Sequence, residues 1–264
     1  MMPAFCPAMP ARSLPRKCSW SCAIGVITVA GEIVDGDAGP GPAGGDRIAV
    51  YASNHPESFI TLLAASRIGA ILVPLNWRLS AAELSWQMAD AAPALLIHGP
   101  YFTEMATKLA TQSACPHIAL GGELDAATDG HHLTEADGAG RPDAELMIVY
   151  TSGTTGRPEG AVLAQPAMIA NAVMSHDAYA MTPDDVVLNI LPLFHVGGLN
   201  IQPLPALLLG AHVVIAPAFD PATTLALIET HAVTQVTVVP TVLAALLARE
   251  TWPAANLDLS LIHI

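Results

Sequence analysis

The chain has 264 residues, of which 52% are hydrophobic and 12% charged, and its formal net charge is −13. This acidic balance argues against electrostatic binding to nucleic acid, which needs clustered Lys and Arg. The length is sufficient for one large domain or two subdomains, each with a buried core. The longest apolar stretch, residues 203–219, is interrupted by Pro203, Pro205, Gly210 and His212, so no membrane span is predicted.

Residues 1–45 are rich in Pro and Gly, and residues 36–45 contain almost no large side chains. Such a segment buries little apolar surface, so we assign it to no domain and expect it to be the least ordered part of the chain. An alternative interpretation is a signal peptide, with Arg12, Arg16 and Lys17 before the apolar residues 23–30.

From residue 46 onward, the sequence predicts alternating strands and helices, which is typical of an α/β fold with mostly parallel sheets covered by helices. The helix signals include a capping box from Ser80 to Glu83 and the cap-plus-proline pair Asp220-Pro221. Predicted strands cover residues 47–52, 70–74, 94–98, 146–150, 186–191, 212–216 and 233–239. Predicted helices cover residues 56–68, 80–91, 166–178, 199–209, 221–231 and 240–248.

Residues 121–143 contain Gly, Asp, Pro142 and the pair His131-His132, and they predict a surface connection. The two histidines could be a metal pair, but no carboxylate or cysteine partner stands at ligand spacing. The four cysteines, at positions 6, 18, 22 and 115, have neither zinc-ligand spacing nor a disulfide framework. We therefore predict no metal site, and a reducing cytoplasm is the simplest location.

A loop of glycine and hydroxyl residues follows the predicted strand at 146–150. Glycine lets backbone N–H groups turn inward together, and the hydroxyls add donors, so the loop is suited to phosphate oxygens. The GTPase phosphate loop is excluded because Gly-Lys-Ser/Thr is missing; the remaining alternative is a polar turn between two elements. The predicted phosphate-binding residues are Thr151, Ser152, Gly153, Thr154, Thr155 and Gly156.

A second motif, Leu-Pro-Leu-Phe-His-Val-Gly-Gly-Leu, occupies residues 191–199 and contains His195. Taken alone, His195 would more often be a buried core histidine with satisfied hydrogen bonds than a functional residue. The two motifs in this order closely resemble the adenylate-forming (AMP-binding) superfamily, which includes acyl- and aryl-CoA synthetases, luciferases and peptide-synthetase adenylation domains. The likeness covers approximately residues 46–258, including residues 70–79.

The resemblance implies that residues 46–264 are a partial large N-terminal domain, truncated at its C-terminal side. It implies ATP, Mg²⁺ and CoA as cofactors and a carboxylic acid as substrate, and it gives His195 the role of a gate at the acyl pocket. A carboxylate would attack the α-phosphate of ATP, and CoA would then take the acyl group from the acyl-adenylate. Catalysis of this kind depends on positioning and on stabilising oxygen charge. The acid and the oligomeric state are left open.

The chain departs from the family pattern in two ways. Glu159 stands at a loop position where the family most often has lysine, and this charge reversal either weakens phosphate binding or is tolerated at the surface. The later family motifs for adenine, ribose, metal and the catalytic lysine are absent. We therefore expect the chain alone to be inactive; the alternative is a non-catalytic binding or interaction module.

Overall fold

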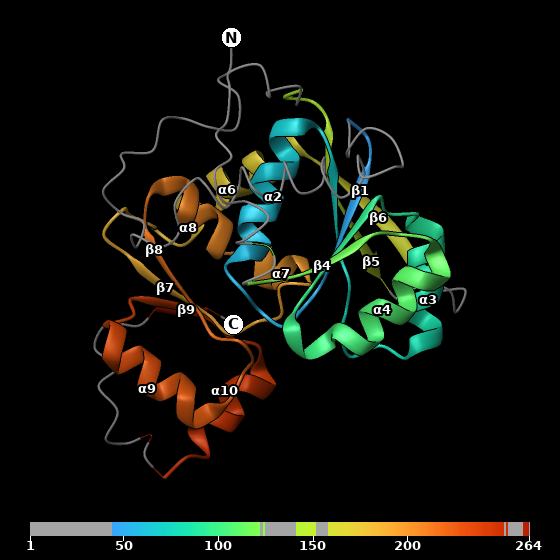
Figure 1. The fold of residues 1–264 in the computed structure, drawn as a ribbon. Helices are drawn as coiled ribbons and strands as arrows, with labels where there is room; N and C mark the ends of the chain where they lie inside the picture. Colours follow the sequence, from blue (N-terminus) through green and yellow to red (C-terminus); the bar gives the residue numbers. More distant parts are fainter. Residues whose placement is uncertain are drawn as a thin grey trace. The chain divides into compact units, whose positions relative to one another are not determined.

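The computed structural model describes residues 44–121, 124, 141–151, 158–250 and 252, and the backbone of 261–263 (Figure 1). The chain divides into two compact units. Within the described residues, unit 1 holds 44–52 and Pro56–Ala167, and unit 2 holds Ser53–His55 and residues from Met168 onward. The expectation of low order for residues 1–45 falls outside the described residues, apart from 44 and 45.

Unit 1 contains a six-stranded sheet with the strand order β4-β3-β1-β2-β5-β6. Neighbouring strands run parallel except β5 and β6, which are antiparallel. Ile48 of β1 aligns with Leu72 of β2 and Leu95 of β3 at the centre of the sheet. The strands are β1 (Arg47–Tyr51), β2 (Ile71–Pro74), β3 (Leu95–His98), β4 (His117–Ala119), β5 (Glu145–Thr151) and β6 (Glu159–Ala164).

The helical segments of unit 1 with described bounds are α2 (Glu57–Ile68), α3 (Ala81–Ala91), the short 3-10 helix η1 (Pro100–Phe102) and α4 (Thr103–Ser113). The predicted capping box is confirmed, because the Ser80 side chain accepts from the backbone N–H of Glu83 while the Glu83 carboxylate accepts from that of Ser80. Helix α2 ends at Gly69, whose φ of 75° is in the left-handed region that glycine adopts without strain.

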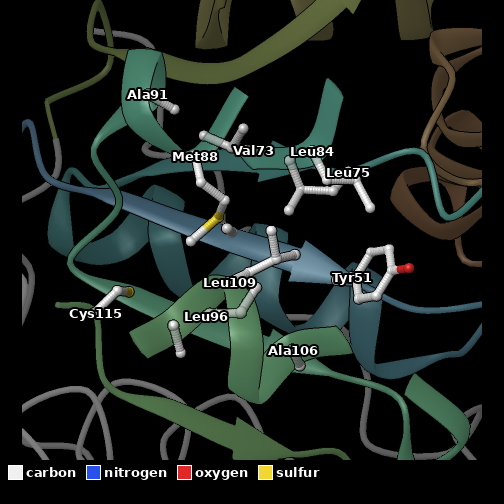
Figure 2. Packing of buried hydrophobic residues seen from close by; sticks show 12 residues of the cluster. Tyr51, Val73, Leu75, Leu84, Met88, Ala91, Leu96, Ala106, Leu109 and Cys115 are labelled. Carbon is white, nitrogen blue, oxygen red and sulfur yellow. The ribbon is translucent and has the colours of Figure 1, made fainter. Parts of the chain in front are cut away.

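The central strands of the unit 1 sheet are buried on both faces, as expected for parallel strands between helices, because β2 and β3 are buried at every position. The antiparallel edge strand β6 is exposed over most of its length. Alternate residues of β1, including Ala49 and Tyr51, join a core cluster with side chains of α3 and α4. Figure 2 shows Leu84, Met88 and Leu109 of this cluster pointing toward one another. This packing supports the central strands of the sheet to which β5 and β6 also belong.

Unit 2 is built on a four-stranded parallel sheet with the strand order β10-β9-β7-β8. The strands are β7 (Val186–Asn189), β8 (His212–Ile215), β9 (Gln235–Thr237) and β10 (Leu261–His263). The helices are α6 (Gln165–Ala178), which begins with the last residues of unit 1, α7 (Val196–Asn200), α8 (Pro203–Leu209), α9 (Pro221–His231) and α10 (Pro240–Leu247). The predicted cap of α9 is confirmed, since the Asp220 carboxylate accepts from Thr223 N–H at 2.8 Å.

The predicted α/β class and the order of elements are confirmed, but one predicted helix is wrong. Residues 199–209 form two helices, α7 and α8, instead of one. Pro203 begins α8, and its missing N–H and its ring interrupt a continuous helix. Gln202 before it lies outside the regular helical region, with φ −124° and ψ −44°. The structure also adds α4 and β4, which the sequence pattern did not predict.

No helix in the part of the chain that the structure describes has both the length and the apolar character needed to cross a membrane. The predicted surface connection at 121–143, including His131-His132, lies almost wholly outside the described residues.

Candidate functional site

The candidate phosphate loop connects the two antiparallel strands of unit 1, β5 and β6. The ladder pairs Tyr150 with Gly160 and Thr151 with Glu159, so these pairs form the base of the loop. The backbone on both sides of the loop is therefore fixed by strand pairing. The remaining predicted phosphate ligands lie outside the described residues: Ser152, Gly153, Thr154, Thr155 and Gly156.

Thr151 and Glu159 stand directly opposite each other at the last pair of the ladder. In an antiparallel pair, directly opposite side chains lie on the same face of the sheet. Both residues are exposed. The structure therefore places the atypical carboxylate beside the first predicted phosphate ligand, a relation that the spacing of eight residues in sequence did not reveal.

Tyr150 anchors the loop base to helix α3. Its hydroxyl donates to Asp90 Oδ2 at 2.6 Å, and its ring meets the Trp86 ring edge-on at 5.9 Å between centroids. Burial raises the pKa of Tyr150, and the hydrogen bond to the negative Asp90 raises it further. Trp86 and Asp90 are four residues apart and so share one face of α3, which explains how a single helix contacts both the ring and the hydroxyl.

Gly160 of β6 lies close to two side chains of the paired strand β5. A Cβ at this position would lie 2.8 Å from Ile148 Cγ2 and 3.4 Å from the Tyr150 ring. The first distance would force the Ile148 side chain to shift, whereas the second is ordinary van der Waals contact. Glycine therefore lets the two strands pair without displacing Ile148.

The second motif connects β7 to α7 in unit 2, and we call residues 191–195 the His195 segment. Leu193 is buried and His195 is exposed, immediately before the first residue of α7. His195 N–H donates to the Pro192 carbonyl at 3.2 Å. Because His195 is exposed, the alternative of a buried core histidine does not hold; its role at an acyl pocket stays a prediction.

Gly198 allows α7 to approach the start of the His195 segment. A Cβ at Gly198 would lie 2.2 Å from the Pro192 carbonyl oxygen and 2.7 Å from that of Leu191. These are backbone atoms, so relieving the clash would require the chain itself to move. Close packing against the backbone therefore explains why the second residue of the Gly-Gly pair is glycine.

Asn54 contacts the His195 segment directly, and the sequence pattern did not single it out. Its amide nitrogen donates to the carbonyls of Leu191 at 2.9 Å and Ala216 at 3.0 Å, and its oxygen accepts from Leu193 N–H at 2.9 Å. Asn54 belongs to the short piece Ser53–His55 that clusters with unit 2. No local signal could have found it, because its partners are more than 130 positions away in sequence.

No group of three His, Cys, Asp or Glu side chains that could hold a metal ion occurs within the described residues. We assign no Mg²⁺ ligand among these residues. The loop base belongs to unit 1 and the His195 segment to unit 2.

A model of the AMP-binding enzyme family matches residues 40–263. An indoleacetate–CoA ligase from Aromatoleum aromaticum is 40% identical over 222 residues, which are 80% of this chain and 43% of that protein. A feruloyl-CoA synthase from Amycolatopsis is 38% identical over 214 residues, covering 81% of this chain and 42% of that protein. The chain thus spans less than half the length of these relatives.

Solved structures agree with the fold. ATP-bound MatB from Rhodopseudomonas palustris matches with a TM-score of 0.76 and 28% identity, over 88% of this chain and 45% of that one. The N-terminal domain of FACL13 from Mycobacterium tuberculosis matches with a TM-score of 0.77 over 91% of this chain and 58% of that one. Its identity of 24% supports the fold alone.

Proposed function

The chain belongs to the AMP-binding enzyme family, and from that premise we propose that it is part of an acid–CoA ligase. The complete enzyme would join a carboxylic acid to AMP with release of pyrophosphate, and would then transfer the acyl group to the CoA thiol. The observation that carries this proposal is the hairpin in unit 1, where strand pairing fixes both ends of a glycine- and threonine-rich loop. CoA ligases among the relatives support the reaction class.

The loop residues are assigned to the phosphates of ATP. Thr151 to Gly156 would supply hydroxyl and backbone N–H donors to the departing pyrophosphate, whose oxygens gain charge as the bond to the α-phosphorus breaks. The Thr151 side chain at the loop base is exposed and open to such a ligand. Donors held in place before the reaction stabilise this charge without reorganising, and the ladder between β5 and β6 supplies that rigidity at the base.

The His195 segment is assigned to the acyl pocket. The exposed His195 at the start of α7 would border the carboxylic acid and gate its access, as the family resemblance implies. Mg²⁺ would neutralise phosphate charge in the complete enzyme. ATP and CoA are the other expected small-molecule partners, and a cytoplasmic location follows from the need for both.

We propose an aromatic carboxylic acid as the substrate. Relatives of 33–40% identity include ligases named for indoleacetate, ferulate and 2-succinylbenzoate, and each of these acids contains an aromatic ring. An assay panel should therefore include aryl, arylalkyl and aliphatic acids of similar size. A preference for long aliphatic acids would contradict this substrate class while leaving the reaction class intact.

Acid-dependent exchange of labelled pyrophosphate into ATP tests the proposed reaction. The 264 residues alone should form no acyl-CoA, because the segments that the resemblance assigns to adenine, ribose and the catalytic lysine are not among them. A version extended by downstream coding sequence should show exchange. Replacing Thr154 and Thr155 by alanine in it should lower the exchange rate by about tenfold or more, since phosphate donors are lost.

Two results would contradict the proposal. Robust thioester synthesis by the 264-residue chain would show that the later segments are not needed. No exchange in the extended protein with any acid of the panel would overturn the assignment as an acid–CoA ligase.

A further inference from the structure

Asn54 is 5% exposed, and its side-chain amide makes three hydrogen bonds to backbone groups. A primary amide has two N–H donors and a carbonyl oxygen that can accept two hydrogen bonds. Here the nitrogen donates to two backbone carbonyls, of Leu191 and Ala216, and the oxygen accepts from the backbone N–H of Leu193. An amide that meets three backbone groups in a buried position fixes them with respect to one another.

These backbone groups lie where the ladder between two parallel strands ends. Strands β7 and β8 pair up to Asn189 and Ile215, and the N–H of Ala216 donates to the Asn189 carbonyl at 3.0 Å. Beyond that rung, side-chain amides meet the backbone: the Leu191 carbonyl accepts from Asn54 Nδ2 at 2.9 Å and from Asn189 Nδ2 at 3.1 Å. The backbone N–H of Asn54 also donates to the Pro217 carbonyl at 3.1 Å. The Asn54 amide takes the place of the next rung, because it bridges both carbonyls.

We propose that Asn54 is a positioning residue that holds the His195 segment at the carboxyl ends of β7 and β8. The two residues of this segment that the Asn54 amide contacts, Leu191 and Leu193, flank Pro192. The Pro192 carbonyl in turn accepts from His195 N–H at 3.2 Å. Short contacts therefore run from the Asn54 amide to the backbone of His195. That Asn54 holds the His195 segment in place follows from these contacts alone. That the held segment helps to bind the carboxylic acid rests on the proposed function.

Asn54→Asp provides a readout that a general loss of stability would not give. An ionised carboxylate cannot donate to Leu191 or Ala216, and it would face two carbonyl oxygens. A neutral carboxyl can donate to one of them and still accept from Leu193 N–H. Burial raises the pKa of a carboxyl, so the introduced group should become neutral in mildly acidic solution and restore part of the bridge.

Gln235 offers a matched control in the same unit. It is 4% exposed, and its amide donates to the Tyr179 carbonyl at 3.3 Å and accepts from Gln202 Nε2 at 3.2 Å. Gln235→Ala therefore removes a buried amide with its hydrogen bonds from β9 but leaves the His195 segment untouched. Any effect that Asn54→Ala and Gln235→Ala share reports on the loss of a buried amide in general.

Backbone hydrogen exchange on the 264-residue chain, read by mass spectrometry, tests the geometric part without any activity. Asn54→Ala should accelerate exchange in peptides covering 190–196 by about tenfold, with less than about a twofold change in 225–236. Gln235→Ala should show the reverse pattern.

For Asn54→Asp, the ratio of variant to wild-type exchange in 190–196 should fall toward one between pH 7.5 and pH 5. Equal acceleration throughout unit 2 in both Asn54 variants, or none in 190–196, would overturn the proposal.

Kinetics of the extended enzyme test the functional part. Asn54→Asp should raise KM for the carboxylic acid by about tenfold at pH 7.5 and leave KM for ATP within about twofold, because the segment it holds is assigned to the acid. Equal loss on both substrates would overturn this part even if local exchange behaves as expected. If no protein, wild type included, turns over any acid, the proposed function fails, whereas the exchange pattern still decides whether Asn54 positions the segment.

Discussion

The loop base in unit 1 and the His195 segment in unit 2 are held by different kinds of contact. Strands β5 and β6 position the loop base through a backbone ladder between residues close in sequence, and Tyr150 adds one side-chain anchor. The His195 segment begins where a ladder ends, and it is held by the side chain of Asn54, whose contact with Leu193 spans 139 positions.

This difference has a consequence for how each region responds to change. A backbone ladder tolerates most side-chain substitutions, since its hydrogen bonds involve main-chain groups alone. The bridge at the His195 segment is made by side-chain amides, that of Asn54 with a further bond from Asn189 to the Leu191 carbonyl, so it depends on few residues and on the space around them. We therefore expect substitutions in unit 2 near the His195 segment to have larger effects than comparable substitutions near the loop base.

Gly198→Ala should produce the largest effect. The added Cβ would lie 2.2 Å from the Pro192 carbonyl oxygen, a backbone atom that Asn54 helps to hold. Overpacking of this kind should lower the free energy of unfolding of unit 2 by about 3 kcal/mol. Urea unfolding, combined with hydrogen exchange to localise the loss, measures it.

Gly197→Ala is the matched control, because a Cβ there would lie 3.7 Å from Ile201 Cδ1, which is ordinary contact. Its helical position favours alanine over glycine, so stability should stay equal or rise by up to about 1 kcal/mol. Equal losses in the two variants would contradict the close-packed path from Asn54 to α7.

Sequence reasoning reached the regular elements because their signals are local. The capping box at Ser80, the cap at Asp220 and the strand before Thr151 each depend on residues within one turn or one strand, and all three are confirmed. The break at Pro203 was also visible in the sequence, yet residues 199–209 were predicted as one helix. Local signals thus gave most elements, but they joined α7 and α8 and missed α4 and β4.

The candidate site was predictable only in part. The motif order located the loop and His195, and their roles stay predictions, with Ser152 to Gly156 outside the described residues. The position of Glu159 opposite Thr151 depends on the register of β6, which a single sequence does not specify. Asn54 could not be found, because its partners become neighbours only after the parallel sheet of unit 2 has formed.

Tyr150→Phe tests the single side-chain anchor of the loop base. It removes the hydrogen bond to Asp90 and leaves the ring against Trp86, so unit 1 should lose about 1 kcal/mol of stability. The ladder itself should persist, with little change in hydrogen exchange along β5. Tyr101, which is 94% exposed, provides the control, and Tyr101→Phe should leave stability unchanged. A loss of β5 protection comparable with the effect of Asn54→Ala on 190–196 would erase the contrast between the regions.

Cys115 reports on the dry apolar core that supports the sheet of unit 1. Burial raises the pKa of its thiol from 9.0 to about 12. The folded state therefore favours the protonated thiol: its contribution is complete below pH 9 and declines as the unfolded thiol ionises. At pH 10 the loss should be about 1 kcal/mol relative to pH 8. Urea unfolding at both pH values should show this extra loss in the wild type but not in Cys115→Ala; equal losses would mean that the core admits water.

Glu159→Lys should have the smallest effect, and it tests whether the exposed loop base contributes through charge alone. Glu159 lies opposite Thr151 at the loop base, so its carboxylate repels a phosphate held there, and lysine would attract it. Solvent screening limits the gain, and we expect pyrophosphate to bind the variant about two- to fivefold more tightly, with the gain shrinking as salt is added.

Glu145→Lys makes the same change in net charge at the other end of β5, where Glu145 pairs with Ala164, and it should leave affinity unchanged. Isothermal titration of the three proteins separates a local effect from one of net charge. Equal gains in both variants would show that total charge is responsible, and weaker binding in Glu159→Lys would place the phosphates on the far side of the loop from this residue.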